Sequence, residues 1–263
     1  TMTAAKLLNA DTRDVFIEFV GLNHLVWGRR VFLKGKDVTG DLLGMMANRA
    51  ALTMKNIPDL AWDSEFLQAL GMIPCPYHRY YYMKDRILAE EMAAAAPEGP
   101  GTRAEQVQAV EERLFELYRD KNLTEKPQEL EKRGGAYYSE AAISLISAIY
   151  NDKRELHTVN TTNRGTIANL PPDCVVETNC VIGKTGAAPI AVGSLPWEIT
   201  GLIHQVKAYE LLAVEAGVTG NKDKALLALV NHPLVPSAEV AGKLLDDLLN
   251  INADHLPQFC RSV

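Results

Sequence analysis

The chain has 263 residues, of which 47% are hydrophobic and 23% charged, and its formal net charge is -6. This composition is typical of a globular protein with a sizeable core, built as one large domain or two small ones. No block of five Lys or Arg residues is present, so we expect no nucleic-acid partner. No apolar run approaches the roughly 18 residues of a membrane span, so we expect no membrane partner.

The four cysteines are scattered and form no C-x-x-C pair: Cys75, Cys174, Cys180 and Cys260. So few cysteines in a long chain argue against a disulfide framework or a zinc finger. The first residues also lack the apolar core of a signal peptide. We therefore expect a cytoplasmic protein with reduced thiols, in which Cys174 and Cys180 are small buried residues.

A run of β-branched and aromatic residues near the start predicts two strands, over 14–20 and 25–34. Gly21 and the polar pair Asn23-His24 interrupt this run, as a site at the edge of a sheet would. Histidine is the commonest metal ligand. A histidine in an apolar run is also often a hydrogen-bonded core residue, and the local pattern leaves both interpretations open.

The middle of the chain favours helices, over 40–53, from Asp63 onward, over 103–121 and from 133 to 150. Between them, a segment with four tyrosines around His78-Arg79 predicts either a packed aromatic layer or the wall of a polar pocket. Arg79 could offer its planar fork to a carboxylate or phosphate, or simply stack on an aromatic ring. The small residues over 93–101 predict an exposed loop tip.

The last part of the chain returns to strands and then becomes helical. A strand over 155–160 leads into a polar loop, and strands over 174–182 and 188–193 flank the hairpin signature Gly183-Lys184-Thr185-Gly186. Helices are expected over 197–218, 221–230 and 236–251, and their Leu/Ala pattern indicates packing, including against another subunit. The predicted class is α+β, with a small, mostly antiparallel sheet surrounded by many helices.

Several ordered segments together resemble glycoside hydrolase family 4, in its 6-phospho-β-glucosidase branch. They are Gly21-Leu22-Asn23-His24-Leu25, the segment from Arg133 to Ser139, the segment from Val159 to Pro171, and Val192-Gly193-Ser194-Leu195-Pro196, followed by similar stretches at 232–234 and 241–248. The resemblance covers nearly the whole chain. The Leu22 variant of the first motif favours the β-glucoside branch.

The resemblance implies that residues 1–263 are the C-terminal domain of such an enzyme, with a fold like the C-terminal domain of lactate dehydrogenase. In the family, an N-terminal Rossmann domain holds NAD, and a Cys-Asn motif after it supplies a metal-binding cysteine. This sequence contains no G-x-G-x-x-G, so the Rossmann domain is expected as a partner outside the chain. NAD and Mn²⁺ are the implied cofactors, and this chain alone is not expected to bind them.

The family resemblance also implies a reaction outside the usual two-carboxylate scheme. Carbon 3 of the sugar is oxidised, the proton on carbon 2 is removed, the aglycone is eliminated and water adds. The substrate is a phosphorylated disaccharide or β-glucoside. On this resemblance His24 is the metal ligand, Tyr138 is the base, and Tyr137 is the alternative base. Substrate contacts are expected from Asn23, Asn160, Asn163 and Arg164.

The sequence also allows other interpretations of the function. The chain could be a non-catalytic dimerisation or sugar-binding module, or could carry another family 4 specificity for α-glucosides or α-galactosides. The substrate domain of a lactate or malate dehydrogenase is a further alternative. That class needs a catalytic His-Asp pair with substrate-binding arginines, and no such constellation is evident. A homodimer or homotetramer is the expected assembly.

Overall fold

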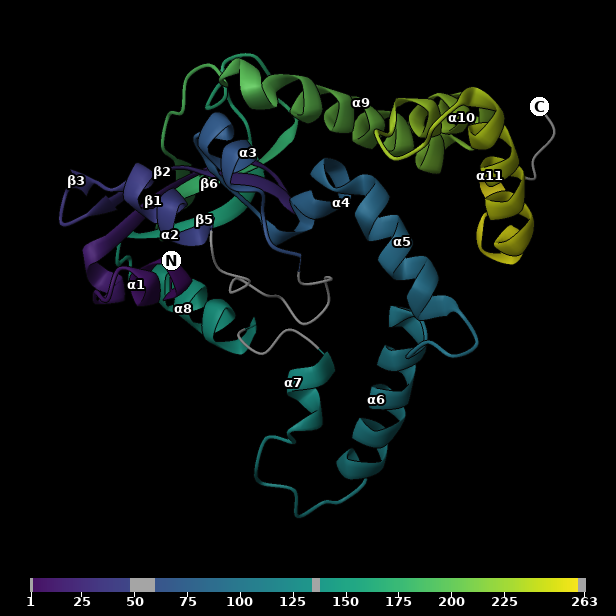
Figure 1. Cartoon of the computed structure of the whole chain (residues 1–263), viewed down its shortest axis with the longest axis horizontal. Coiled ribbons are helices and arrows are strands. Elements are labelled where there is room, and N and C mark those ends of the chain that lie inside the picture. Colours follow the sequence, from purple (N-terminus) through teal and green to yellow (C-terminus); the bar gives the residue numbers. More distant parts are fainter. Residues whose placement is uncertain (1, 48–59, 134–137, 260–263) are drawn as a thin grey trace. The chain divides into compact units, whose positions relative to one another are not determined.

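The computed structural model describes residues 2–47, 60–133 and 138–259. The chain divides into two compact units, the first formed by residues 1–161 and 176–190 and the second by residues 162–175 and 191–263. Figure 1 shows the elements of both units along the chain. The first unit contains most of the sheet, and the second contains the C-terminal helices.

A sheet of seven strands forms in the described part of the chain. Its central order is β3-β2-β1-β6-β5, while β4 pairs with β2 and β7 pairs with β6. The strands are β1 (Val15–Leu22), β2 (Leu25–Leu33), β3 (Lys36–Asp37), β4 (Ile73–Pro74), β5 (Glu155–Thr162), β6 (Val175–Gly183) and β7 (Gly186–Pro189). β1 is antiparallel both to its sequence neighbour β2 and to the distant β6.

Helices pack against this sheet, and two of the apolar clusters that they form among the described residues are as follows. The first core joins Val15, Ile17 and Val31 of β1 and β2 to Leu42 and Leu67. Its helices are α1 (Met2–Leu7), α2 (Thr39–Met46) and α3 (Ser64–Leu70). The second core packs Ala148 of α8 (Tyr138–Tyr150) against Cys180 and Ile182 of β6. Alternate β1 residues Val15 and Ile17 share one face because side chains alternate along a strand.

The remaining helices of the first unit are α4 (Arg79–Tyr82), α5 (Lys84–Ala95), α6 (Arg103–Tyr118) and α7 (Glu129–Arg133). The second unit contains α9 (Trp197–Thr219), α10 (Lys222–Asn231) and α11 (Ala238–Ile251). Short 3-10 turns lie at Thr12–Asp14, Pro76–His78, Ala253–His255 and Pro257–Phe259. No helix in the described ranges has the length and apolar character that a membrane span requires.

The predicted α+β class is confirmed, and most predicted elements are present. The strand predicted over 188–193 is wrong in its bounds, since β7 covers Gly186–Pro189. Gly186 pairs directly with Gly183 across a two-residue turn, and beyond Pro189 the amides of Val192 and Gly193 donate to Thr166 O instead. The loop predicted over 93–101 is shorter than expected, because α5 continues through Ala95. The second half of the helix predicted over 40–53 lies outside the described residues.

Gly21 provides a stability test of the β1–β2 hairpin. Its φ is 152°, and an added Cβ would lie 2.1 Å from the carbonyl oxygen of Leu25. We therefore expect Gly21→Ala to lower the free energy of unfolding by about 2–4 kcal/mol, measured by urea unfolding. Gly44→Ala is the matched control, because Gly44 lies in α2 with open space around it and should gain about 0.5–1 kcal/mol. Equal stabilities of the two variants would contradict the strained hairpin.

Candidate functional site

The hairpin between β1 and β2 presents His24 at its tip. Leu22 pairs with Leu25, so Asn23 and His24 alone form the connection. His24 has a φ of 60°, in the left-handed region that a two-residue turn often requires. Both turn residues are exposed, so His24 is not the buried core histidine that the sequence left open. In the part of the chain that the structure describes, its imidazole is therefore exposed to solvent.

Tyr77 is brought to His24 by pairing between strands that are distant in the sequence. Trp27 and Gly28 of β2 pair with Pro74 and Ile73 of β4, and this places the following 3-10 turn beside the hairpin. The rings of His24 and Tyr77 meet edge to face, with centroids 4.3 Å apart and planes at 86°. The Tyr77 ring therefore packs against the exposed imidazole.

The residues that follow Tyr77 form a packed layer beneath this site. His78 is fully buried, with its ring 4.1 Å from that of Trp27. Burial lowers the pKa of His78 to about 3, so its ring stays neutral. Arg79 donates from Nε to Leu60 O at 2.8 Å and lies 5.0 Å over the Trp62 ring. His78 thus packs in the aromatic layer, and Arg79 makes the stacking contact that the sequence allowed.

Glu177 is the residue at this site that the sequence interpretation missed. It lies on β6 opposite Gly21 of β1, close to the end of the strand where the turn with His24 begins. Burial raises the pKa of Glu177, and the His24 amide opposes that rise. The only sequence signal is an acidic residue inside an otherwise apolar strand segment, Val175-Val176-Glu177-Thr178.

Cys75 precedes Tyr77 by two residues and lies near enough to Glu177 to be affected by its charge; we use the name His24 cluster for His24, Cys75, Tyr77 and Glu177. Burial raises the pKa of Cys75 to about 11, and the charge of Glu177 adds to that effect. The thiol is therefore protonated at neutral pH, whereas a cysteine ligand binds metal as the thiolate. The described residues bring no three His, Cys, Asp or Glu side chains together as a metal-holding group. His24 fits a metal as one exposed ligand of a set that would need further donors.

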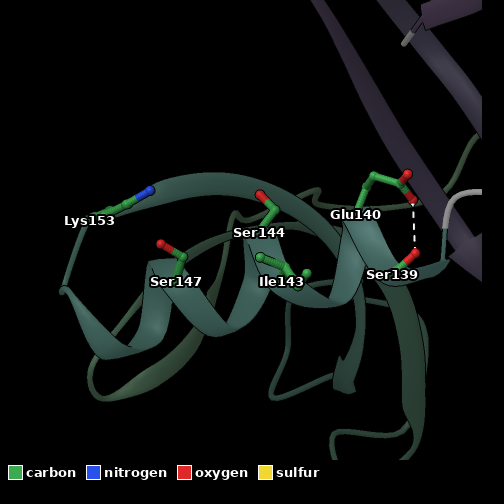
Figure 2. A pocket seen from close by; sticks show the side chains of 6 residues that line it. All are labelled: Ser139, Glu140, Ile143, Ser144, Ser147 and Lys153. Atoms are coloured by element: carbon green, nitrogen blue, oxygen red, sulfur yellow. Dashed lines mark hydrogen bonds between the residues drawn. The ribbon is translucent and has the colours of Figure 1, made fainter. Parts of the chain in front are cut away.

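Tyr138, the base expected from the motif resemblance, is the first residue of α8 and is 78% exposed. Tyr137 lies outside the described residues. A hollow of about 430 Å³ follows Tyr138 along α8 (Figure 2). It is lined by Ser139, Glu140, Ile143, Ser144, Ser147 and Lys153. The hollow shares no residue with the His24 cluster, and the role of Tyr138 stays a prediction.

The residues expected to contact substrate lie in different settings. Asn23 is exposed beside His24, Asn160 is exposed on β5, and Arg164 is exposed with a φ of 48°. Asn163 is fully buried, and its amide nitrogen donates to the carbonyl oxygens of Ile167, Leu170 and Pro171. Its Oδ1 accepts from the Ile167 N–H at 2.7 Å. These contacts explain Asn163 without a ligand, and substrate binding by all four residues stays a prediction.

The Asn163 network predicts a large stability effect. Asn163→Ala leaves two buried carbonyl oxygens, one partly buried carbonyl oxygen and one amide without this partner, so we expect a loss of about 3 kcal/mol in the free energy of unfolding. Asn160→Ala is the control, because the exposed Asn160 should change that free energy by less than about 0.5 kcal/mol. Urea unfolding measures both. A loss below about 1 kcal/mol for Asn163→Ala would show that water replaces the amide.

Comparison with known proteins agrees with this architecture. The family model described as the family 4 glycosyl hydrolase C-terminal domain matches residues 19–235. A probable 6-phospho-beta-glucosidase of Bacillus subtilis is 51% identical over all 263 residues, which make up 59% of that relative. A phospho-alpha-glucosidase of Clostridium acetobutylicum is 30% identical, over 94% of this chain and 58% of its own length.

Solved structures show the same fold. The 6-phospho-beta glucosidase from Thermotoga maritima, in a structure with manganese, NAD+ and glucose-6-phosphate, superposes with a TM-score of 0.84 at 36% identity. The match covers 97% of this chain and 58% of that one. The chain belongs to glycosyl hydrolase family 4 and corresponds to its C-terminal domain. It spans about three fifths of the length of the relatives it matches.

Proposed function

We propose that this chain is the metal- and substrate-binding part of an NAD- and Mn²⁺-dependent 6-phospho-β-glucosidase. The observation that carries the proposal is 51% identity along the whole chain to a probable 6-phospho-beta-glucosidase. The identity to a phospho-alpha-glucosidase is only 30%, which favours the β-glucoside branch over the α branch. The proposed substrate is a phosphorylated disaccharide or β-glucoside, in keeping with the glucose-6-phosphate held by a structural relative.

His24 is proposed as a metal ligand, because its imidazole stands exposed at the two-residue tip of the β1–β2 hairpin. When bound, NAD would accept hydride from the sugar and Mn²⁺ would polarise its oxygens. The protonated thiol of Cys75 makes a poor second ligand, so the thiolate ligand is proposed to come from an N-terminal part beyond this chain. An N-terminal Rossmann domain is proposed to hold NAD there.

A tyrosine is proposed to remove the proton at carbon 2 of the sugar. The motif resemblance assigns this role to Tyr138, whereas the geometry favours Tyr77, whose ring contacts that of His24. An ordinary tyrosine has a pKa of about 10, and a cation bound nearby would lower it. Asn23, adjacent to His24, is proposed to orient sugar hydroxyls. Asn160, Asn163 and Arg164 are proposed to contact the substrate.

A homodimer or homotetramer in the cytoplasm is the proposed setting. Large apolar side chains are exposed on α8, including Ile143 and Ile146, and on α11, including Ile251 at 80% exposure. Exposed apolar side chains in such number favour burial in an assembly. Light scattering of the full-length protein, coupled to size-exclusion chromatography, would measure its mass. A monomer at micromolar concentration would contradict the assembly.

The activity itself is tested with the full-length protein that carries this chain. We expect it to cleave 4-nitrophenyl β-glucoside 6-phosphate only when both NAD and Mn²⁺ are present, and to cleave the α anomer far more slowly. The unphosphorylated glucoside is the matched control and should react poorly. Activity that is unaffected by removal of NAD would contradict the proposal. Absence of any glycosidase activity would favour the dimerisation or sugar-binding alternative.

A further inference from the structure

The C-terminal helices of the second unit keep small side chains inside and turn large apolar side chains outward. Over residues 211–251, all of which the structure describes, the buried apolar residues are Ala216, Ala228 and Ala241. Large apolar side chains are exposed on all three helices: Leu211, Val214 and Val218 on α9, Leu227 and Val230 on α10, and Val240, Leu244, Leu248 and Ile251 on α11. Such an arrangement indicates a surface that another molecule covers.

α11 carries the most regular of these exposed surfaces. Its four exposed apolar residues recur at steps of four, four and three, so they lie within about 80° of the helix circumference. We call this row the α11 stripe: Val240, Leu244, Leu248 and Ile251. Ala241 is fully buried and marks the side of α11 that packs within the unit. The stripe therefore lies beside the packed side of the helix, where the described residues leave it exposed.

Two opposite charges border one edge of the α11 stripe. Lys243 and Asp247 are exposed and four residues apart, so helical periodicity places both on the edge away from Ala241. Neither takes part in an ion pair of the described residues. An apolar row with a cation and an anion along one edge has the composition of an interface, with an apolar centre and a charged rim.

The positions of these charges favour a second copy of the chain as the partner. The centre of the α11 stripe lies midway between Val240 and Ile251. When two copies of α11 pack antiparallel across a two-fold axis at this centre, Lys243 of one copy lies within one residue of Asp247 of the other, about 1.5 Å along the axis. This symmetry brings the same edge of both stripes together, so the opposite charges meet twice. A parallel arrangement would set the charged edge against the edge near Ala241.

We propose that the α11 stripe is a self-association surface, on which α11 of one copy packs antiparallel against α11 of a second copy. The proposal deepens the assembly given under the proposed function, because it names the surface that each copy offers. It does not depend on the glycosidase activity. Burial of the apolar row stabilises the contact. The pairing of Lys243 with Asp247 selects the antiparallel orientation over others.

Charge exchange in the full-length protein tests this arrangement. In its own dimer, the Lys243→Glu variant sets acidic side chains against Asp247 at both contacts, and the Asp247→Lys variant sets basic side chains against Lys243. Each variant therefore repels a second copy of itself. A mixture of the two variants pairs opposite charges at both contacts and should associate. Lys36→Glu is the matched control, because Lys36 is an exposed lysine on β3 in the first unit.

Light scattering coupled to size-exclusion chromatography measures the mass of each sample at micromolar concentration. We expect Lys243→Glu and Asp247→Lys each to weaken self-association by about 100-fold or more and to show half the parent mass. Their equimolar mixture and Lys36→Glu should both show the parent mass. Leu248→Asp should also halve the mass, and neither charge variant should restore it. Far-ultraviolet circular dichroism should match the parent in every case, because the substituted side chains are exposed.

Four results would overturn the proposal. The first is an unchanged mass for both charge variants, and the second is a halved mass that the mixture does not restore. The third is an unchanged mass for Leu248→Asp with a lowered thermal midpoint, since the rest of the full-length protein then covers the stripe. The fourth is a monomeric parent protein. Absence of phosphoglucoside cleavage with the expected masses would count against the proposed function alone.

Discussion

Replacing His24 by alanine in the full-length protein is expected to weaken Mn²⁺ binding by at least about 100-fold and to abolish Mn²⁺-dependent cleavage at micromolar metal. Loss of a supporting residue around a metal already costs about 10–100-fold, so loss of a ligand should cost more. The fold should be unaffected, because the side chain is exposed at a hairpin tip. Isothermal titration with Mn²⁺ and the thermal midpoint of unfolding measure the two effects separately.

His204→Ala is the control for this experiment, because His204 is an exposed histidine on α9 in the second unit. We expect it to bind Mn²⁺ as the parent protein does. If His24→Ala also binds Mn²⁺ with unchanged affinity, His24 is not a ligand. If the His24→Ala variant also keeps its activity, His24 has no role in catalysis and serves only as a residue of the turn.

Replacing Tyr77 by phenylalanine is expected to lower kcat by about 100-fold or more, the range for loss of a general base. The substitution removes only the hydroxyl and keeps the ring that packs edge-on against His24 at 4.3 Å. The thermal midpoint should therefore stay close to that of the parent protein. Initial rates at saturating substrate, NAD and Mn²⁺ measure kcat.

Tyr138→Phe is measured in parallel, because the motif resemblance points to that residue. The variant with the larger loss of kcat identifies the base, and we expect it to be Tyr77→Phe. Tyr150→Phe serves as the control, since Tyr150 is 85% exposed at the end of α8. A loss of kcat confined to Tyr138→Phe would return the role to the residue that the motif indicated.

Local pattern was sufficient for much of the fold. The β-branched run with its Asn23-His24 interruption gave the β1–β2 hairpin, and the three-to-four spacing of apolar residues gave α6 and α8. These elements are determined by neighbours in the sequence, through strand alternation and helical periodicity. The bounds predicted for the short strand β7 were wrong because the strand ends where the following chain forms hydrogen bonds with Thr166 O. Thr166 is distant in the sequence, so no local pattern indicates that end.

The site was less visible in the sequence, because its members meet through long-range pairing. Tyr77 reaches His24 only because β4 pairs with β2, and Glu177 reaches it only because β6 pairs with β1. Neither pairing leaves a local signature, since strand partners are chosen by the whole fold. The sequence placed Asn163 in a polar loop, but it could not show that the side chain bonds to the loop's own backbone, since those bonds depend on how the loop folds.

The full-length protein to which this chain belongs is proposed to cleave its substrate by removing the proton at carbon 2 of the sugar. Cleavage of a phosphorylated β-glucoside by the full-length protein in D₂O tests this proposal most directly, with the released glucose 6-phosphate analysed by nuclear magnetic resonance. We expect deuterium at carbon 2 of that product, because the abstracted proton exchanges with solvent before one returns. Product released at the normal rate with only hydrogen at carbon 2 would contradict proton removal at this carbon.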